Sequence, residues 1–119
     1  MSDEQAVRST VLDYYDGWFD GDPTRMERAL HPGLAKRAQL ADGALDEDTA
    51  AGMIAMTAEG RGKRSDPGPE KRGTEVDVVE VYGSIATAVV RSNIYREYLH
   101  LVRTENGWKI VNALYDLER

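Results

Sequence analysis

The sequence contains no cysteine and only two histidines among its 119 residues. The missing cysteines exclude disulfides, thiolate metal ligands and a cysteine nucleophile. A metal site needs about three or four ligands, and His31 and His100 are too few and too far apart in the sequence to supply them. There is also no glycine-rich phosphate loop and no serine nucleophile motif. We therefore expect neither a metal nor a cofactor.

Long apolar runs and an excess of positive charge are also missing. The formal net charge is -6 and the pI is near 4.9, so the surface repels nucleic-acid phosphates and anionic membranes. No segment reaches transmembrane length, and the opening residues 1–5 lack the basic and apolar regions of a signal peptide. We expect one cytoplasmic domain over residues 1–119 that binds neither nucleic acid nor membranes.

The first segment with a regular pattern is an amphipathic helix. Ser2 and Gln5 have the spacing of a capping box, which predicts a helix from about residue 3 that ends at Gly21. Apolar residues then recur at helical spacing, and they are Val7, Val11, Leu12, Tyr14, Tyr15, Trp18 and Phe19. The last two turns of this helix are unusually aromatic.

Two more helices and a short strand follow. Asp22 is the N-cap and Pro23 the first residue of a second helix, which ends at residues 31–33. Residues 34–40 form a short strand, and a third helix is expected over 46–58 with an aspartate as its N-cap.

Residues 60–73 differ from their surroundings in composition. They combine glycine and proline with five basic residues, so they have little to bury, and we expect a mobile loop. Loops of this length are uncommon unless they are disordered or functional, so a working lid is the alternative.

The rest of the chain predicts two hairpins. Gly83-Ser84 joins strands over 74–82 and 85–92, which places Val79 opposite Ala88 and Val81 opposite Ala86.

Asn106-Gly107 is a strong signal for a type I′ turn inside the run from Glu97 to Glu118. A two-residue loop at that place pairs Leu101 with Asn112. One face of this ribbon then carries Leu99, Leu101, Trp108, Ile110, Asn112 and Leu114. The opposite face carries Tyr98, His100, Val102, Val111 and Tyr115, and we expect it to form the contact of a homodimer because aromatic residues are enriched at interfaces.

Helices gathered first and strands gathered last predict an α+β fold. The N-terminal helices should pack on one face of a strongly curved, mainly antiparallel sheet and leave a hollow between the two layers.

Several stretches resemble the nuclear transport factor 2-like superfamily. They are Tyr14–Asp22 (YYDGWFDGD), Ala29–Pro32 (ALHP) and Asn106–Asn112 (NGWKIVN). His31–Arg37 (HPGLAKR) and Glu97–Leu101 (EYLHL) resemble the subgroup labelled putative lumazine-binding. The resemblance covers nearly the whole chain and implies a cone-shaped fold. It implies little about function, because this fold hosts isomerases, dehydratases, hydrolases, ligand binders and structural dimers.

Among these relatives, the ketosteroid isomerases have an oxyanion-hole tyrosine eight residues before the aspartate of a Gly-Asp corner. Tyr14 matches it, eight residues before Asp22. Their general-base aspartate lies on the first strand, where this chain has Arg37 and Ala38, so the resemblance supplies the tyrosine without the base.

Three inward-facing candidates could bind a ligand. Tyr14 and Trp18 lie one helical turn apart, where they either line the mouth of a pocket or fill the core. Asn112 shares an otherwise apolar face, and a buried amide must find a hydrogen-bond partner in a neighbour, a water or a ligand.

The two remaining candidates, Arg37 and His31, can carry a positive charge. Arg37 and Lys36 alternate on the first strand, so one of them must point toward the helices, although an edge strand usually keeps its charges in water. Arg37 is included among the ligand-binding residues. So is His31, for which a structural role at a helix C-terminus is the alternative.

The residues leave three functions open. The first is a binder of a small aromatic or heterocyclic molecule in a mainly apolar pocket. The second is an isomerase, cyclase or dehydratase in which Tyr14 and Asn112 polarise the carbonyl of a small ketone. The third is a homodimeric adaptor with no ligand.

Overall fold

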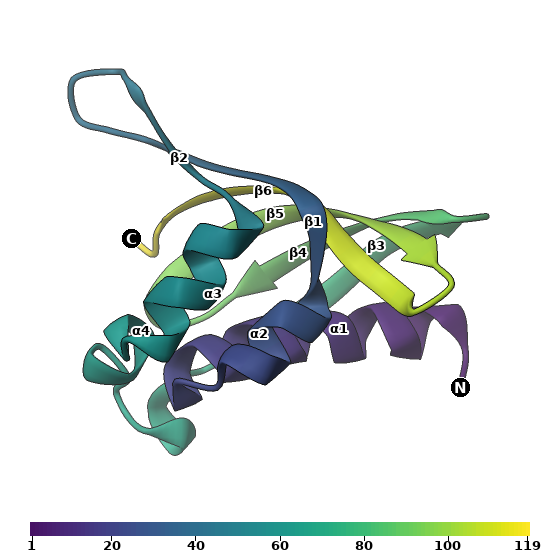
Figure 1. Ribbon diagram of the computed structural model, residues 1–119, viewed down its shortest axis with the longest axis horizontal. Coiled ribbons are helices and arrows are strands. Elements are labelled where there is room, and N and C mark those ends of the chain that lie inside the picture. Colours follow the sequence, from purple (N-terminus) through teal and green to yellow (C-terminus); the bar gives the residue numbers. More distant parts are fainter.

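A computed structural model describes residues 1–119, with the helices mostly first in the chain and the strands mostly last (Figure 1). The helical elements are α1 (Asp3–Asp20), α2 (Pro23–Ala29), α3 (Ala50–Ala58), α4 (Arg61–Arg64) and the 3-10 turn η1 (Pro69–Lys71). The strands are β1 (Leu30–Gln39), β2 (Leu45–Asp48), β3 (Glu75–Tyr82), β4 (Ile85–Arg91), β5 (Tyr95–Thr104) and β6 (Gly107–Leu117).

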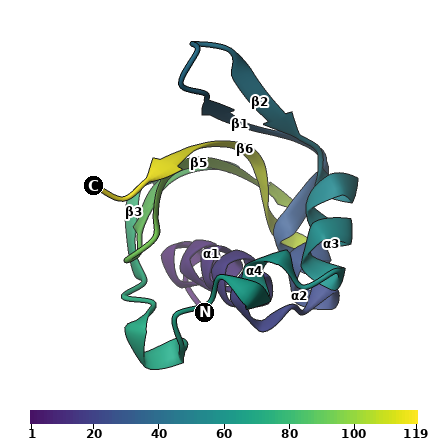
Figure 2. The same ribbon diagram turned by 90° about the vertical axis from the view of Figure 1, so that its left-hand side faces the viewer.

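One six-stranded sheet has the order β2-β1-β6-β5-β4-β3, and only β1 and β6 pair in parallel. Figure 2 shows the sheet arching over α1, with α2 and α3 beside it. The predicted α+β class, with helices on one face of a curved and mainly antiparallel sheet, is confirmed.

The sequence signals at the ends of α1 and α2 are confirmed. Ser2 and Gln5 form the capping box, and Gly21 ends α1 in the left-handed region at φ 66°. Asp22 accepts hydrogen bonds from the backbone N–H groups of Thr24 and Arg25 at the start of α2. The apolar stripe of α1 is buried under the sheet through Val7, Val11, Tyr14, Tyr15 and Phe19. Burial of such side chains stabilises the fold by about 1.5–3 kcal/mol each.

The expected third helix starts later than its sequence indicates. Residues 45–48 form β2, which pairs antiparallel with β1, and the N-cap of α3 is Thr49 rather than Asp46. The Thr49 hydroxyl accepts a hydrogen bond from the backbone N–H of Gly52 at 3.0 Å. Acidic residues are favourable in the first turn of a helix, but they are also favourable in a strand beside the cationic β1. Here Arg37 forms an ion pair with Glu47 at 2.9 Å.

The segment expected to be a mobile loop is folded as α4 and η1 and is tied to α1 by Arg72. This side chain is buried, lies over the ring of Phe19, and donates hydrogen bonds to Asp66, Asp20 and Asp16. These hydrogen bonds hold the pKa of Asp66 below its usual range. From composition alone Arg72 is expected to be a solvated charge, but in the structure the polar face of α1 supplies two of its three carboxylate partners, Asp16 and Asp20.

The first hairpin follows the predicted pairing near its turn and departs from it at a bulge. Val81 lies opposite Ala86 as expected, but Val78 rather than Val79 lies opposite Ala88, because the register shifts between residues 78 and 80.

The register predicted for the last hairpin is wrong. Thr104 pairs with Gly107, so the loop is Glu105–Asn106. No residue other than glycine has positive φ, while Gly107 has φ 98°. A type I′ turn would require positive φ at both central residues, so this turn is of another type, with the positive φ on the glycine that follows the loop.

A second irregularity on β6 shifts the pairing again between Leu101 and His100. Leu101 lies opposite Ile110 and His100 lies opposite Asn112, which leaves Val111 as the extra residue. The faces of the ribbon therefore differ from those that a regular hairpin would have.

Candidate functional site

The shifted register moves three residues of β6 to the face opposite the predicted one. The Asn112 side chain lies on the outer face with its amide nitrogen 3.3 Å from Nδ1 of the exposed His100, and Leu114 is exposed. The predicted inward position of Asn112 is thus wrong, because a one-residue slip moves a side chain to the other face. Tyr115, expected on the outer face, turns toward the helices instead.

A cavity of about 290 Å³ lies under the arched sheet. Its lining comes from α1, β1, β2, α3, α4, β5 and β6, and consists of Tyr14, Tyr15, Trp18, Lys36, Asp46, Asp48, Met53, Met56, Arg61, Tyr95, Glu97 and Tyr115. Aromatic and methionine side chains make up most of its walls. Its charged groups fall into two sets, one buried and one at the rim.

The buried set is centred on Glu97, which is only 2% exposed. The Tyr14 hydroxyl donates to Oε2 at 2.9 Å and the Tyr15 hydroxyl donates to Oε1 at 2.8 Å. Consecutive residues of a helix point about 100° apart, so α1 can place one tyrosine against each carboxylate oxygen. Each oxygen of Glu97 therefore has its own phenol donor.

Lys36 supplies the positive charge beside this carboxylate. Its Nζ lies 3.6 Å from Oε2 of Glu97 and donates a hydrogen bond to the Tyr14 hydroxyl. The same ammonium lies 4.9 Å from the ring centre of Tyr14 and 4.6 Å from that of Tyr115. A buried cation needs such partners, and here a carboxylate and two aromatic faces provide them.

These surroundings keep the tyrosines protonated. Burial raises the pKa of Tyr14 well above its usual value, and the negative charge of Glu97 raises it further. The pKa of Tyr15 is raised by the same two causes. Burial also raises the pKa of Tyr115, with added effects from Asp46 and Asp48. All three hydroxyls are hydrogen-bond donors at neutral pH.

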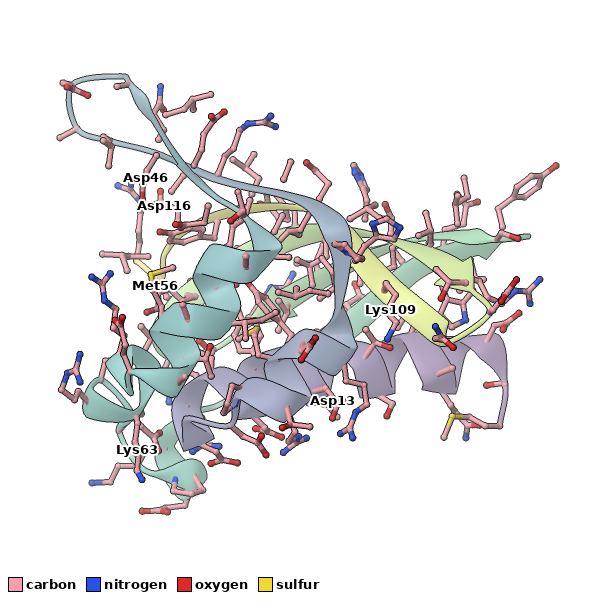
Figure 3. All side chains as sticks on the ribbon, in the orientation of Figure 1. Asp13, Asp46, Met56, Lys63, Lys109 and Asp116 are labelled. Carbon is pink, nitrogen blue, oxygen red and sulfur yellow. The ribbon has the colours of Figure 1, made fainter.

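The rim is formed by β2, α3 and α4. Asp46 and Asp48 alternate with Glu47, so they line the cavity while Glu47 points away. Neither aspartate forms an ion pair or a side-chain hydrogen bond within the chain. Figure 3 shows Asp46 at the same end of the molecule as Met56, which also lines the cavity.

The structure brings two of the five predicted site residues to the cavity, Tyr14 and Trp18. Arg37 instead forms a surface ion pair with Glu47, since it points away from the helices on β1. His31 belongs to β1 rather than to the end of α2, and its Nδ1 accepts a hydrogen bond from the backbone N–H of Gly33 at 2.9 Å. Asn112 lies outside the cavity as described above.

Sequence reasoning did not place Tyr15, Glu97 and Tyr115 at the site, and of the two alternating cations of β1 it selected Arg37, although Lys36 is the one that points inward. It also left out the polar lining residues Asp46, Asp48, Arg61 and Tyr95. Glu97 had a detectable signal, because it shares the inner face of β5 with Leu99 and Leu101. A lone carboxylate in an otherwise apolar alternation is costly unless it is paired. It therefore indicates a partner elsewhere in the fold.

No group of three or more His, Cys, Asp or Glu side chains is arranged to hold a metal ion. None of the helices combines the length and apolar character needed to cross a membrane.

The family described as "Putative lumazine-binding" matches residues 2–116. The chain belongs to this family. The match confirms the resemblance seen in the sequence, and it covers every residue that lines the cavity. No curated protein matches this member of the family.

Solved structures of nuclear transport factor 2-like proteins share the fold of this family member. One from Shewanella baltica, of unknown function, has a TM-score of 0.76 and 17% identity, over 98% of this chain and 94% of that one. Another from Silicibacter pomeroyi, also of unknown function, has a TM-score of 0.72 and 18% identity, over 99% and 100%. A third, from Novosphingobium aromaticivorans, has a cystatin-like fold, a TM-score of 0.66 and 20% identity, over 97% and 81%. At these identities the likeness establishes the nuclear transport factor 2-like fold alone.

Proposed function

We propose that the protein binds a small, flat aromatic or heterocyclic molecule in the cavity under the sheet. The observation that carries this proposal is the cavity itself, with aromatic walls and the buried Lys36–Tyr14–Glu97 network at one side. Ligand sites are mostly apolar hollows with a few well-placed polar groups. Seven of the twelve residues that line this cavity are aromatic or methionine, the other five are charged, and its volume of about 290 Å³ is close to the lower limit of the usual range of about 300–1,000 Å³.

The family description points to the same class of molecule. Lumazine is a fused two-ring heterocycle, and a compound of that shape suits a narrow space between aromatic side chains. Trp18, Tyr95 and Tyr115 contribute aromatic rings to the lining, while Met53 and Met56 offer adaptable apolar contacts. Lumazines, flavins and flat polyketides are therefore the compounds to test.

Binding is favoured over carbonyl chemistry for two reasons. The enzyme hypothesis relies on Tyr14 and Asn112 together, and Asn112 lies on the other side of the sheet. Glu97 does place a carboxylate in the cavity, but two phenols donate to it and an ammonium lies beside it. Both of its oxygens are already engaged by these donors, so the carboxylate is not free to take a proton from a bound ketone. An adaptor with a completely filled core is disfavoured by the cavity.

The outer face of the sheet supports self-association as a second property of this protein. Tyr82, Ile85, Tyr98 and Leu114 are 76%, 57%, 54% and 46% exposed, which leaves an unusually apolar surface around His100. We expect a homodimer through this face, in which the exposed Leu114 replaces Tyr115 as the β6 contact residue.

Ligand binding is tested by thermal unfolding with saturating lumazine, a flavin and a flat polyketide. At about a 100-fold excess over Kd, a ligand stabilises the folded state by about 2.7 kcal/mol, which is a shift of several degrees in Tm. Met56→Trp places a larger side chain at the cavity wall and should abolish the shift. Arg37→Ala, on the outer side of β1, should keep it. Absence of a shift with every compound, or an equal shift in Met56→Trp, would reject the proposal.

A further inference from the structure

Lys36 has hydrogen-bonding capacity that the chain does not use. An ammonium group carries three N–H donors, and the only hydrogen bond that Nζ of Lys36 makes within the chain goes to the Tyr14 hydroxyl. Glu97 lies at 3.6 Å, which contributes charge attraction but exceeds the length of a hydrogen bond. The Lys36 side chain is 10% exposed and lines the cavity. A ligand that fills the cavity displaces water from the two remaining N–H donors of Lys36, so it must either accept hydrogen bonds from them or leave them unpaired.

Two of the three N–H donors of the Lys36 ammonium have no hydrogen-bond acceptor within the chain, whereas each oxygen of Glu97 has at least one donor. Both oxygens of Glu97 already accept hydrogen bonds from phenols. The network therefore presents a spare donor to a ligand, and a ligand oxygen is the matching group. Leaving a buried donor unpaired is costly, so a ring without such an oxygen should bind less tightly.

The surrounding charges decide what kind of oxygen fits. Glu97 already balances the charge of Lys36, and Asp46 and Asp48 at the rim have no cationic partner. Arg61 is the remaining cation of the lining, so the five charged groups sum to -1. Because its three carboxylates outnumber its two cations, the lining disfavours an anionic oxygen overall, whereas a neutral carbonyl gains a hydrogen bond from the ammonium without that penalty.

We propose that the cavity selects a neutral ring carbonyl compound whose carbonyl oxygen accepts a hydrogen bond from Nζ of Lys36. The ring then lies beside Tyr115, whose face already packs against the same ammonium. This inference rests on the proposed function and assigns its ligand class: oxo-substituted rings in preference to rings without oxygen and to ring carboxylates.

The ligand class is tested on the unaltered protein by isothermal titration with three probes built on one ring. Lumazine carries two ring carbonyls, pteridine lacks them, and a pteridine carboxylate carries an anionic oxygen. At slightly acidic pH, where lumazine is neutral, it should bind about ten- to a hundredfold more tightly than either of the others, the usual effect of one hydrogen bond to a charged group.

The role of Lys36 is tested by the double variant Lys36→Met/Glu97→Gln, which removes both charges and leaves no unpaired ion. In this variant the affinity for lumazine should fall to that for pteridine, while the affinity for pteridine stays within about twofold. Arg37→Met, one position along β1 but on its outer side, is the matched control and should keep the preference for lumazine.

The outcomes separate this inference from the proposed function. Failure of all three probes to bind would overturn this inference, and it would overturn the proposed function as well if a flavin and a flat polyketide also gave no thermal shift. Equal binding of lumazine and pteridine would retain a ligand site and overturn the carbonyl class. Tighter binding of the carboxylate, or an unchanged preference in the double variant, would also overturn the assignment to Lys36.

Discussion

The strongest test of the buried network is a double-mutant cycle on Lys36 and Glu97. Their side chains are 10% and 3% exposed, and Nζ lies 3.6 Å from Oε2. Lys36→Met leaves the Glu97 charge without its cation, and Glu97→Gln leaves the Lys36 charge without its anion. Removing one partner of a buried ion pair costs about 3–5 kcal/mol of folding stability. We expect each single variant to fall in this range.

The double variant should lose much less than the sum of the two single variants. Replacing both members of a buried pair by neutral residues is often close to neutral, so a coupling free energy of at least about 2 kcal/mol is expected. Urea unfolding followed by far-UV circular dichroism gives the three free energies. Tryptophan fluorescence gives a second signal, because Trp18 lies in the cavity wall.

Additive losses would contradict the geometry. Residues that do not interact give free-energy changes that add within about 0.5 kcal/mol. If Lys36→Met and Glu97→Gln were additive to that extent, the two charges would not face each other in solution. The proposed ligand contact would then lose its structural basis.

Three further predictions concern pH, the α4 region and self-association. The pKa values of Tyr14 and Tyr15 are raised by burial and by Glu97, so their contribution to stability is complete below about pH 10 and is lost as the pH rises above the unfolded value. The urea midpoint should therefore fall above about pH 10, and it should fall less steeply with pH in Tyr15→Phe. Equal pH dependence of the two midpoints would refute the assignment. Arg72→Met leaves three carboxylates together and should cost about 2–4 kcal/mol in urea unfolding, whereas a loss below about 0.5 kcal/mol would show that Arg72 does not hold this region. Tyr98→Glu should convert a dimer into a monomer in light scattering, and a monomeric parent protein would reject the interface.

The elements that sequence reasoning predicted correctly depend on local interactions. The capping box of Ser2 and Gln5 and the Asp22-Pro23 start of α2 involve residues within one helical turn. The α+β order follows from patterns that extend over whole segments. Tyr14 and Trp18 reach the cavity because a helix of the predicted phase must present them to the sheet.

The errors occur where a residue's partner lies far away in the chain. The acidic run that forms β2 suits a helix start locally, but pairing with β1 makes it a strand. Arg72 belongs to a segment with the composition of a flexible loop, and its partners Asp16 and Asp20 are more than fifty positions earlier. The bulge at Val111 has no local signal comparable to Asn106-Gly107, yet it decides which face Asn112 occupies.

The network of the cavity shows why inspection of single strands is insufficient. Lys36 is on β1 and Glu97 is on β5, and β6 lies between these strands in the sheet. Tyr115 of β6 pairs with Glu97 in register, and its ring packs against the ammonium of Lys36. On β1 alone Lys36 resembles a solvent-facing residue, whereas Glu97 lies on the buried face of β5, and the two meet under the sheet although they are two strands apart. Since isolated buried charges are unstable, an unexplained charge on an inner face of such a sheet predicts a second one of opposite sign, and the space between them is the place to look for a ligand.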